Sequence, residues 1–231
     1  MNKGRGKNVG LEDMSHKAFN DIRRMLYHKE LVPGQKIVYR ELKEKLSMSP
    51  TPIIQALKWL EIQGLVYRKP NSGYYIAPCT LEELEELFDL RQLIEPSLVP
   101  AAVENLDEDG LKELESSLEA YRSLETNTYV KERLFRNREF HLTLASLSKK
   151  RNQIRILENI FDLLLLKYGG NYLPIPSLKS VNKEHKKIFE YVSARKPKEA
   201  RKLLSKHTAN VREQVVTSYR RMLEEKERAE F

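Results

Sequence analysis

The twenty residues SMSPTPIIQALKWLEIQGLV, from Ser47 to Val66, constrain the fold of this chain more than any other stretch. Apolar side chains recur there at helical spacing, namely Ile53, Ala56, Leu57 and Leu60. Proline suits the first turn of a helix, and a hydroxyl beside it can cap the free N–H groups. We therefore predict a helix with Pro52 in its first turn, capped by Ser49 or Thr51. It ends at Gly64. A short helix with small polar residues at its N-terminus has the form of one that enters the DNA major groove.

The flanking segments predict the rest of a small domain over residues 12–78. One helix is expected from about Ser15 to His28, and a second from Tyr39 or Arg40 to Leu46. After the third helix, residues 65–68 and 74–77 form two strands around a turn of Lys, Pro, Asn, Ser and Gly. Three helices followed by a β-hairpin make a winged helix-turn-helix. Residues 1–11 are polar and are expected to form a disordered tail.

The remaining residues, 79–231, predict an all-α antiparallel helical bundle, so that the fold class is mainly α. Thr80 and Glu83 form a capping box at the start of its first helix, in which Pro96 and Pro100 indicate a break. Further amphipathic segments follow at residues 107–126, 129–148, 152–168, 181–194 and 197–227. The pattern contains no strand after Ala77, and residues 169–176 read as the one long loop of this part.

Positive charge is concentrated in the first of these two parts. Residues 1–78 hold 14 Lys and Arg against 7 Asp and Glu, whereas residues 79–231 hold 27 against 26. The net charges are therefore +7 and +1, which together give the +8 of the whole chain. A basic small domain beside a neutral larger one indicates a polyanionic partner such as DNA for the first domain. The alternative is a solvated basic face.

Other classes of protein are disfavoured by simple features of the sequence. No apolar run approaches the length needed to span a membrane, and the N-terminus lacks the apolar core of a signal peptide. Cys79 is the only cysteine, so no internal disulfide can form. We therefore expect a cytoplasmic protein without a membrane partner.

Three of the five histidines lie on apolar helical stripes in the second part, and these are His141, His185 and His207. His185 precedes the turn at Lys196 by eleven residues and His207 follows it by eleven, so an antiparallel hairpin places both rings at one height. A buried imidazole needs a partner, and neutral imidazole is a common ligand of transition metals. The pattern favours a divalent metal site of zinc, nickel or manganese. Core histidines with ordinary hydrogen bonds are the alternative.

In these features the chain resembles a GntR-type transcription regulator of the FadR subfamily with an FCD ligand-binding domain. The resemblance covers residues 12–225 or so. In the first domain it is carried by Leu31, Pro33, Gly34, Arg40, Glu41, Leu42, Ser49, Thr51, Pro52, Ala56, Leu57, Leu60, Gly64, Leu65, Val66 and Gly73. It implies a homodimer that places two winged helices on a two-fold DNA operator.

The resemblance also implies which residues contact DNA. Arg40 matches a family residue that binds DNA, and the other candidates are Ser49, Thr51, Gln55, Lys58 and the wing residue Gly73. Pro50 and Ile54 stand where the family has its two recognition arginines. Because arginine reads guanine through two hydrogen bonds, the operator is expected to differ from that of relatives that carry both.

For the second domain, the resemblance implies a metal bound by an Asp-x-x-x-His pair and two later histidines. These positions are Asn137, His141, His185 and His207, so an asparagine replaces the aspartate. Arg91 matches a basic position near the family's effector pocket, and the expected effector is a small organic acid. The alternative for Arg91 is a surface ion pair with a neighbouring glutamate.

Two rival functions remain open at this point. One is a metal-dependent hydrolase, since three histidines with an open coordination position also suit hydrolysis. It lacks a general base, because Glu139 and Glu184 are expected on other helix faces than the histidines beside them, and we predict no enzyme. The other is a metal-free sensor, in which the histidines bind the acid themselves.

Overall fold

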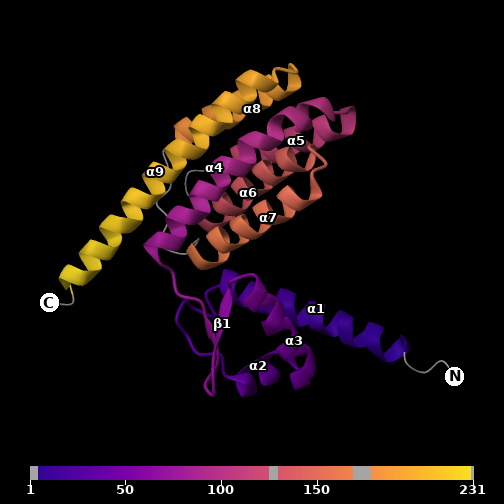
Figure 1. Ribbon diagram of the computed structural model, residues 1–231, viewed down its shortest axis with the longest axis vertical. Coiled ribbons are helices and arrows are strands. Elements are labelled where there is room, and N and C mark those ends of the chain that lie inside the picture. The colour runs from indigo at the N-terminus through magenta and orange to yellow at the C-terminus, as the bar shows by residue number, and fades with distance from the viewer. Residues whose placement is uncertain (1–4, 125–129, 169–177, 230–231) are drawn as a thin grey trace. The chain divides into compact units, whose positions relative to one another are not determined.

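The computed structural model describes residues 5–124, 130–168 and 178–229, and these form two compact units that meet in the sequence between Cys79 and Thr80. Both are mainly helical, and a single two-stranded sheet lies in the first, within the residues described (Figure 1). The predicted fold class is confirmed: a winged helix-turn-helix is followed by an all-α unit.

The first unit consists of α1 (Arg5–Tyr27), α2 (Tyr39–Leu46), α3 (Pro50–Ile62), β1 (Val66–Lys69) and β2 (Gly73–Ile76). Helices α1 and α3 pack against one another through the stripe that the sequence predicted, so that none of its side chains is more than 1% exposed: Ala18, Ile22, Ile53, Ala56, Leu57 and Leu60. Burying each leucine or isoleucine of this stripe contributes about 1.5–3 kcal/mol, which explains why the pattern dominates the fold of this unit.

The strands β1 and β2 form an antiparallel hairpin in which Val66 pairs with Ile76 and Lys69 pairs with Gly73. Asn71 and Gly73 have positive φ angles of 58° and 102° in and beside the turn. Glycine adopts such angles without the steric cost that a Cβ atom brings, so Gly73 suits this end of the hairpin.

Two boundaries in this unit differ from the sequence prediction. Helix α1 begins at Arg5, so residues 5–11, which were expected to be a disordered tail, are helical. The apolar periodicity of this helix starts only at Ala18, and a polar N-terminal extension leaves no mark in such a pattern. Helix α3 begins at Pro50, two residues before Pro52, and Ser49 is its N-cap residue without a hydrogen bond from its own hydroxyl.

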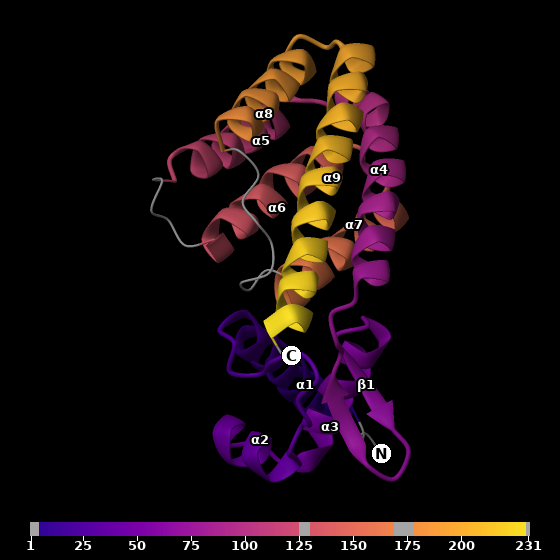
Figure 2. The same ribbon diagram turned by 90° about the vertical axis from the view of Figure 1, so that its left-hand side faces the viewer.

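In its described residues, the second unit is a bundle of helices with one π-helical turn. Its elements are α4 (Leu81–Glu104), α5 (Glu108–Arg122), α6 (Val130–Ser146), α7 (Arg151–Leu163), the π-turn η1 (Leu164–Tyr168), α8 (Leu178–Ser193) and α9 (Pro197–Ala229). The long helices α4 and α9 lie side by side, and α5 packs against α6 and α8 (Figure 2). Leu114, Phe140, Ile188 and Val192 are among the side chains of the common core, each fully or almost fully buried.

Helix α4 runs without interruption through Pro96 and Pro100, so the predicted break is wrong. A proline inside a helix removes one hydrogen bond and costs about 3 kcal/mol. Pro96 is itself buried, and Leu98 and Val99 beside it are at most 1% exposed. Burial of this apolar surface offsets the lost bond, which a local rule about proline cannot foresee.

The π-turn η1 holds the first residues of α4. The hydroxyl of Tyr168 accepts a hydrogen bond from the backbone N–H of Thr80 at 3.1 Å. It lies 2.6 Å from Glu83 Oε2 and 2.9 Å from the Thr80 carbonyl oxygen, the two acceptors for its single proton. Lys167 also pairs with Glu83. Thr80 is the N-cap of α4 as predicted, since its side chain accepts from the N–H of Glu83.

No helix in the described ranges is both long enough and apolar enough to cross a membrane. The loop expected at residues 169–176 lies outside the residues that the structure describes.

Candidate functional site

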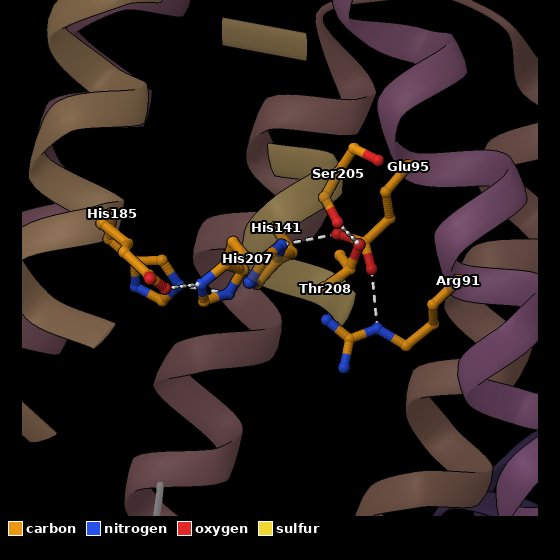
Figure 3. Close-up of polar contacts among 8 residues, drawn as sticks. Arg91, Glu95, His141, His185, Ser205, His207 and Thr208 are labelled. Carbon is orange, nitrogen blue, oxygen red and sulfur yellow. Dashed lines mark hydrogen bonds and ion pairs between the residues drawn. The ribbon is translucent and has the colours of Figure 1, made fainter. Parts of the chain in front are cut away.

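Three histidines from three helices meet in the core of the helical unit. His141 lies on α6, His185 on α8 and His207 on α9, and their side chains point toward one another (Figure 3). All three are at most 2% exposed. The Nε2 atoms of His185 and His207 are 3.2 Å apart, and one ring nitrogen from each of the three rings lies within 4.8 Å of the others. The hairpin of α8 and α9 therefore brings these two residues to one height, as their equal distance from the turn indicated.

Two carboxylates contact Nδ1 atoms of this triad. Glu184 Oε2 lies 2.7 Å from His207 Nδ1 in a hydrogen bond. Glu95 Oε2 lies 2.6 Å from His141 Nδ1, a contact with the length of a hydrogen bond but without its alignment. Glu184 was predicted on another helix face than His185, its neighbour in sequence, and no carboxylate was therefore expected beside the site. The second expectation was wrong, because Glu184 reaches His207 on the next helix. Glu95 was missed, because nothing in the sequence around it names a partner on α6.

Arg91 is buried beside the triad and does not form a surface ion pair. Its Nε donates to Glu95 Oε1 at 2.6 Å, one helical turn away on α4 (Figure 3). Its guanidinium lies 4.4 Å from the centre of the Phe161 ring, within the range of a cation–π contact. Its Nη2 is buried and has no hydrogen-bond partner among the described residues. Guanidinium groups form charge-assisted hydrogen bonds with anionic groups, so this donor has the chemistry to bind one.

Burial sets the charge state of these groups. Desolvation lowers the pKa of His141 to about 4, despite the opposing effect of Glu95, and burial also moves the pKa of His185 well below its ordinary value. Burial alone would raise the pKa of Glu95, but the charges of Arg91 and His141 lower it to about 2. At neutral pH His141 and His185 are therefore neutral imidazoles, which is the form that binds metal.

The donor set fits a divalent transition metal. Tetrahedral ligands at about 2.0–2.1 Å from zinc are separated by little more than 3 Å, close to the distance between the two Nε2 atoms. His141 Nε2 and His185 Nδ1 are buried, and none of the described residues gives either atom a hydrogen-bond partner. Asn137 lies one turn before His141 on α6 and is half-buried, and its part as a ligand stays a prediction.

The pocket beside the triad is closed in this structure. It is lined by Glu95 and His141 with apolar side chains from α4, α6 and α9, and the packing leaves no room for even a water molecule. Tyr121 and Phe140 pack against the His185 ring, with centroids 4.9 and 4.6 Å away.

The residues expected to contact DNA lie on the winged unit. Arg40 stands in the first turn of α2 with 87% of its side chain exposed, and its Nε lies 3.1 Å from Glu44 Oε1. On α3 and its cap, Ser49, Thr51 and Lys58 are exposed and Gln55 is half-buried. Pro50 and Ile54, which replace arginines of the family pattern, are exposed on the same helix.

The hairpin adds basic groups that the sequence analysis did not single out. Tyr67 and Tyr75 stack with ring centroids 5.6 Å apart. Lys69 Nζ lies 4.7 Å from the centre of the Tyr75 ring, and Lys36 Nζ lies 5.9 Å from it. Strand residues two apart share a face, and Tyr67 pairs with Tyr75 across the ladder, so alternation could have found this group.

Comparison with known proteins identifies the class that this architecture defines. Residues 15–76 match the family described as bacterial regulatory proteins, gntR family, and residues 86–210, more than half of the chain, match the FCD domain. The chain belongs to the GntR family and carries an FCD domain: it is a DNA-binding transcription regulator and not an enzyme.

Among its relatives is the HTH-type transcriptional regulator YdhC of Bacillus subtilis (strain 168), which is 29% identical over 189 residues, covering 80% of this chain and 82% of YdhC. LutR of the same organism is 25% identical over 216 residues, covering 84% and 97%. The solved structure of McbR/YncC from E. coli has the same fold, with a TM-score of 0.72 at 22% identity over 90% of this chain and 98% of that one.

Proposed function

We propose that the FCD domain of this regulator binds one divalent transition metal and a small organic acid, and that the acid controls the affinity of a homodimer for its operator. His141, His185 and His207 would hold the metal, and zinc, nickel or manganese would suit the site. When bound, the metal supplies a positive charge and an open coordination position for a carboxylate. The convergence of three buried imidazoles, with nitrogen atoms left without partners, is the observation that carries this proposal.

Arg91 supports the choice of an acid as the effector. Its buried Nη2 is a free donor beside the triad, and guanidinium groups bind carboxylates through charge-assisted hydrogen bonds. Because the pocket is closed, binding an acid there requires the side chains between α4, α6 and α9 to move. A ligand that binds only a rearranged state shifts the population toward that state, which is how an effector can act on a distant domain.

On the operator side, we propose that Arg40 binds a phosphate and that Ser49, Thr51, Gln55 and Lys58 line the major groove with α3. All lie on α2, on α3 or at its cap, and most are exposed. Gly73 would let the hairpin approach the DNA backbone closely. A two-fold operator then requires two such units, which is the reason for proposing a homodimer in a cytoplasmic regulator.

The first test is metal content. The purified protein, dialysed and reconstituted with zinc, nickel or manganese, is expected to retain about one metal ion per chain, and His185→Ala is expected to retain none. His28→Ala is the matched control, since it removes an exposed imidazole from the turn that follows α1. A wild-type protein that retains none of the three metals would contradict the metal site and leave the histidines to bind the acid themselves.

The second test concerns the acid. Acetate, succinate and citrate are added to the metal-loaded protein, and its melting temperature is followed, since a ligand present at 100 times its Kd stabilises by about 2.7 kcal/mol. The acid that stabilises wild type is expected to lose its effect on Arg91→Met. If every acid that stabilises wild type acts equally on that variant, Arg91 is not the anchor.

A further inference from the structure

The Nδ1 atoms of the three histidines differ in their partners. His207 Nδ1 is hydrogen-bonded to Glu184 Oε2. His141 Nδ1 lies 2.6 Å from Glu95 Oε2 (Figure 3). His185 has no such carboxylate: its Nδ1 is buried and has no hydrogen-bond partner among the described residues. Two of the three imidazoles therefore have an acidic side chain at Nδ1, and the third has no such partner among the described residues.

This asymmetry fixes the position of each proton. An ionised carboxylate only accepts hydrogen bonds, so the nitrogen that faces it carries the hydrogen, and in a neutral ring the other nitrogen then presents a lone pair. For His207 this puts the hydrogen on Nδ1 and the lone pair on Nε2, directed at His185. Two lone pairs 3.2 Å apart would repel, so His185 Nε2 carries a hydrogen and donates it to His207 Nε2.

We infer that Glu184 and Glu95 are positioning residues that preset His207 and His141 as metal ligands through Nε2, whereas His185 must change tautomer before it can bind. This inference rests on the proposed metal site and goes beyond it, because it assigns a role to two residues that do not touch the metal. When metal enters, the hydrogen on His185 Nε2 is exchanged for one on Nδ1, and the freed Nε2 lone pair becomes the third ligand.

The two carboxylates also explain how the site can do without an aspartate at position 137. Asn137 is neutral and cannot balance the charge of a divalent cation. Glu184 and Glu95 add negative charge just outside the ligands, and such outer carboxylates raise the basicity of the imidazoles that they contact. Part of the Glu95 charge is taken up by Arg91, whose Nε lies 2.6 Å from it.

Glu184 gives the cleaner test. Its side chain is 19% exposed, and besides the contact with His207 it accepts a long hydrogen bond from Asn210 Nδ2 at 3.4 Å. Glu95 is 2% exposed and holds Arg91 as well, so its replacement would leave a buried charge without its partner. Glu184→Gln keeps the size and shape of the side chain, removes its charge and replaces one acceptor oxygen by an amide donor. Glu190→Gln on the same helix, where the carboxylate pairs with Lys187 at the surface, is the matched control.

The first readout needs no metal. Imidazole ¹⁵N–¹H correlation spectra of the metal-free protein are expected to show Nδ1–H tautomers for His141 and His207 and an Nε2–H tautomer for His185. In Glu184→Gln the Nε2–H form of His207 should gain population, because a carboxamide can donate as well as accept. Glu190→Gln should leave the spectra unchanged. An Nε2–H tautomer of His207 in the wild type would overturn the inference.

The second readout is zinc affinity, measured by competition with a chelator. Glu184→Gln is expected to bind zinc about 10–100-fold more weakly than wild type, with Glu190→Gln equal to wild type. Zinc should also convert His185 to its Nδ1–H form in the wild-type spectrum. If wild type binds zinc and Glu184→Gln binds it as tightly, the positioning role is wrong and the metal site stands. If wild type binds no zinc, nickel or manganese, the proposed site and this inference both fail.

Discussion

The two units of this regulator differ in where the polar residues expected to act are located. In the winged unit the residues expected to act are mostly on the surface, as with Arg40, whose side chain is 87% exposed. In the helical unit they are in the core, where His185 is fully buried and Arg91 is 3% exposed. A surface residue can be replaced with little effect on folding, whereas a buried polar residue is tied to its partners. Binding and stability should therefore be separable in the first unit and coupled in the second.

Acid should reveal this difference most strongly. The pKa of His141 is about 4 in the folded protein, against an ordinary value of 6.5. Between these values the unfolded chain binds a proton that the folded chain does not, so the stability present above pH 6.5 is lost as the pH falls toward 4. A pKa difference of one unit corresponds to about 1.4 kcal/mol, so His141 alone can account for a loss of about 3 kcal/mol in the free energy of unfolding.

The measurement is urea unfolding of the metal-free protein between pH 7 and pH 4.5. Far-UV circular dichroism follows mainly the helical unit, and the fluorescence of Trp59, the single tryptophan, follows the winged unit. The loss of unfolding free energy at low pH should be larger when followed by circular dichroism than by fluorescence. His141→Gln should make that loss smaller. Equal losses in wild type and in His141→Gln would mean that protonation of this buried histidine does not set the acid sensitivity.

A change on the surface of α3 should alter DNA recognition without affecting stability. Ile54→Arg places a guanidinium where the family pattern has one, and a bidentate contact to guanine is worth about 1–3 kcal/mol of discrimination. Selection from a random duplex library should then recover a guanine at one more position than with wild type. Ile62→Arg is the control, since Ile62 lies at the other end of α3 and is 83% exposed. The same sequences recovered for both variants would show that position 54 does not face the bases.

Removing one surface charge should give a smaller effect on affinity. Arg40→Ala is expected to weaken operator binding about tenfold, as is typical for loss of a charged hydrogen bond. The slope of log affinity against log salt should shrink by about 1, because one phosphate contact is lost. Lys202→Ala removes one positive charge from an exposed position on α9. It should leave the affinity and the salt slope unchanged. An unaltered salt slope in Arg40→Ala would exclude a phosphate contact.

Restoring the aspartate of the family pattern should give the smallest change. Asn137→Asp adds a charged oxygen one turn before His141, and divalent metals bind a carboxylate better than a carboxamide. Zinc affinity should rise severalfold. Asn152→Asp, at an exposed position on α7, should not change it. If Asn137→Asp and Asn152→Asp bind zinc equally tightly while His185→Ala no longer binds it, the metal has three histidine ligands and Asn137 is not a ligand.

Much of the architecture could be predicted because it depends on local patterns. The stripe Ile53 to Leu60, the Thr80 cap and the hairpin turn at Gly73 each follow from spacing or from the conformational freedom of one residue. The meeting of His185 and His207 was also predictable, since a hairpin between two helices relates the two positions by simple counting.

The features that were missed depend on contacts between helices. Glu95 reaches His141 from another helix, and Glu184 reaches His207 across the hairpin, although its neighbour in sequence is His185. Helix α4 continues through Pro96 because tertiary burial outweighs a local penalty. In each case the deciding interaction lies outside the window in which a sequence pattern is read.

The bonds between Tyr168 and Thr80 have a practical consequence for work with the separate domains. Thr80 is the first residue after the winged unit, and its backbone N–H and carbonyl are both within hydrogen-bonding distance of a side chain 88 positions later. An isolated FCD domain that starts at residue 86, where the family match begins, would lack Thr80 and Glu83 and leave the Tyr168 hydroxyl without them. A fragment meant to fold on its own should therefore begin before Thr80, so that the end of the linker is retained as part of the domain.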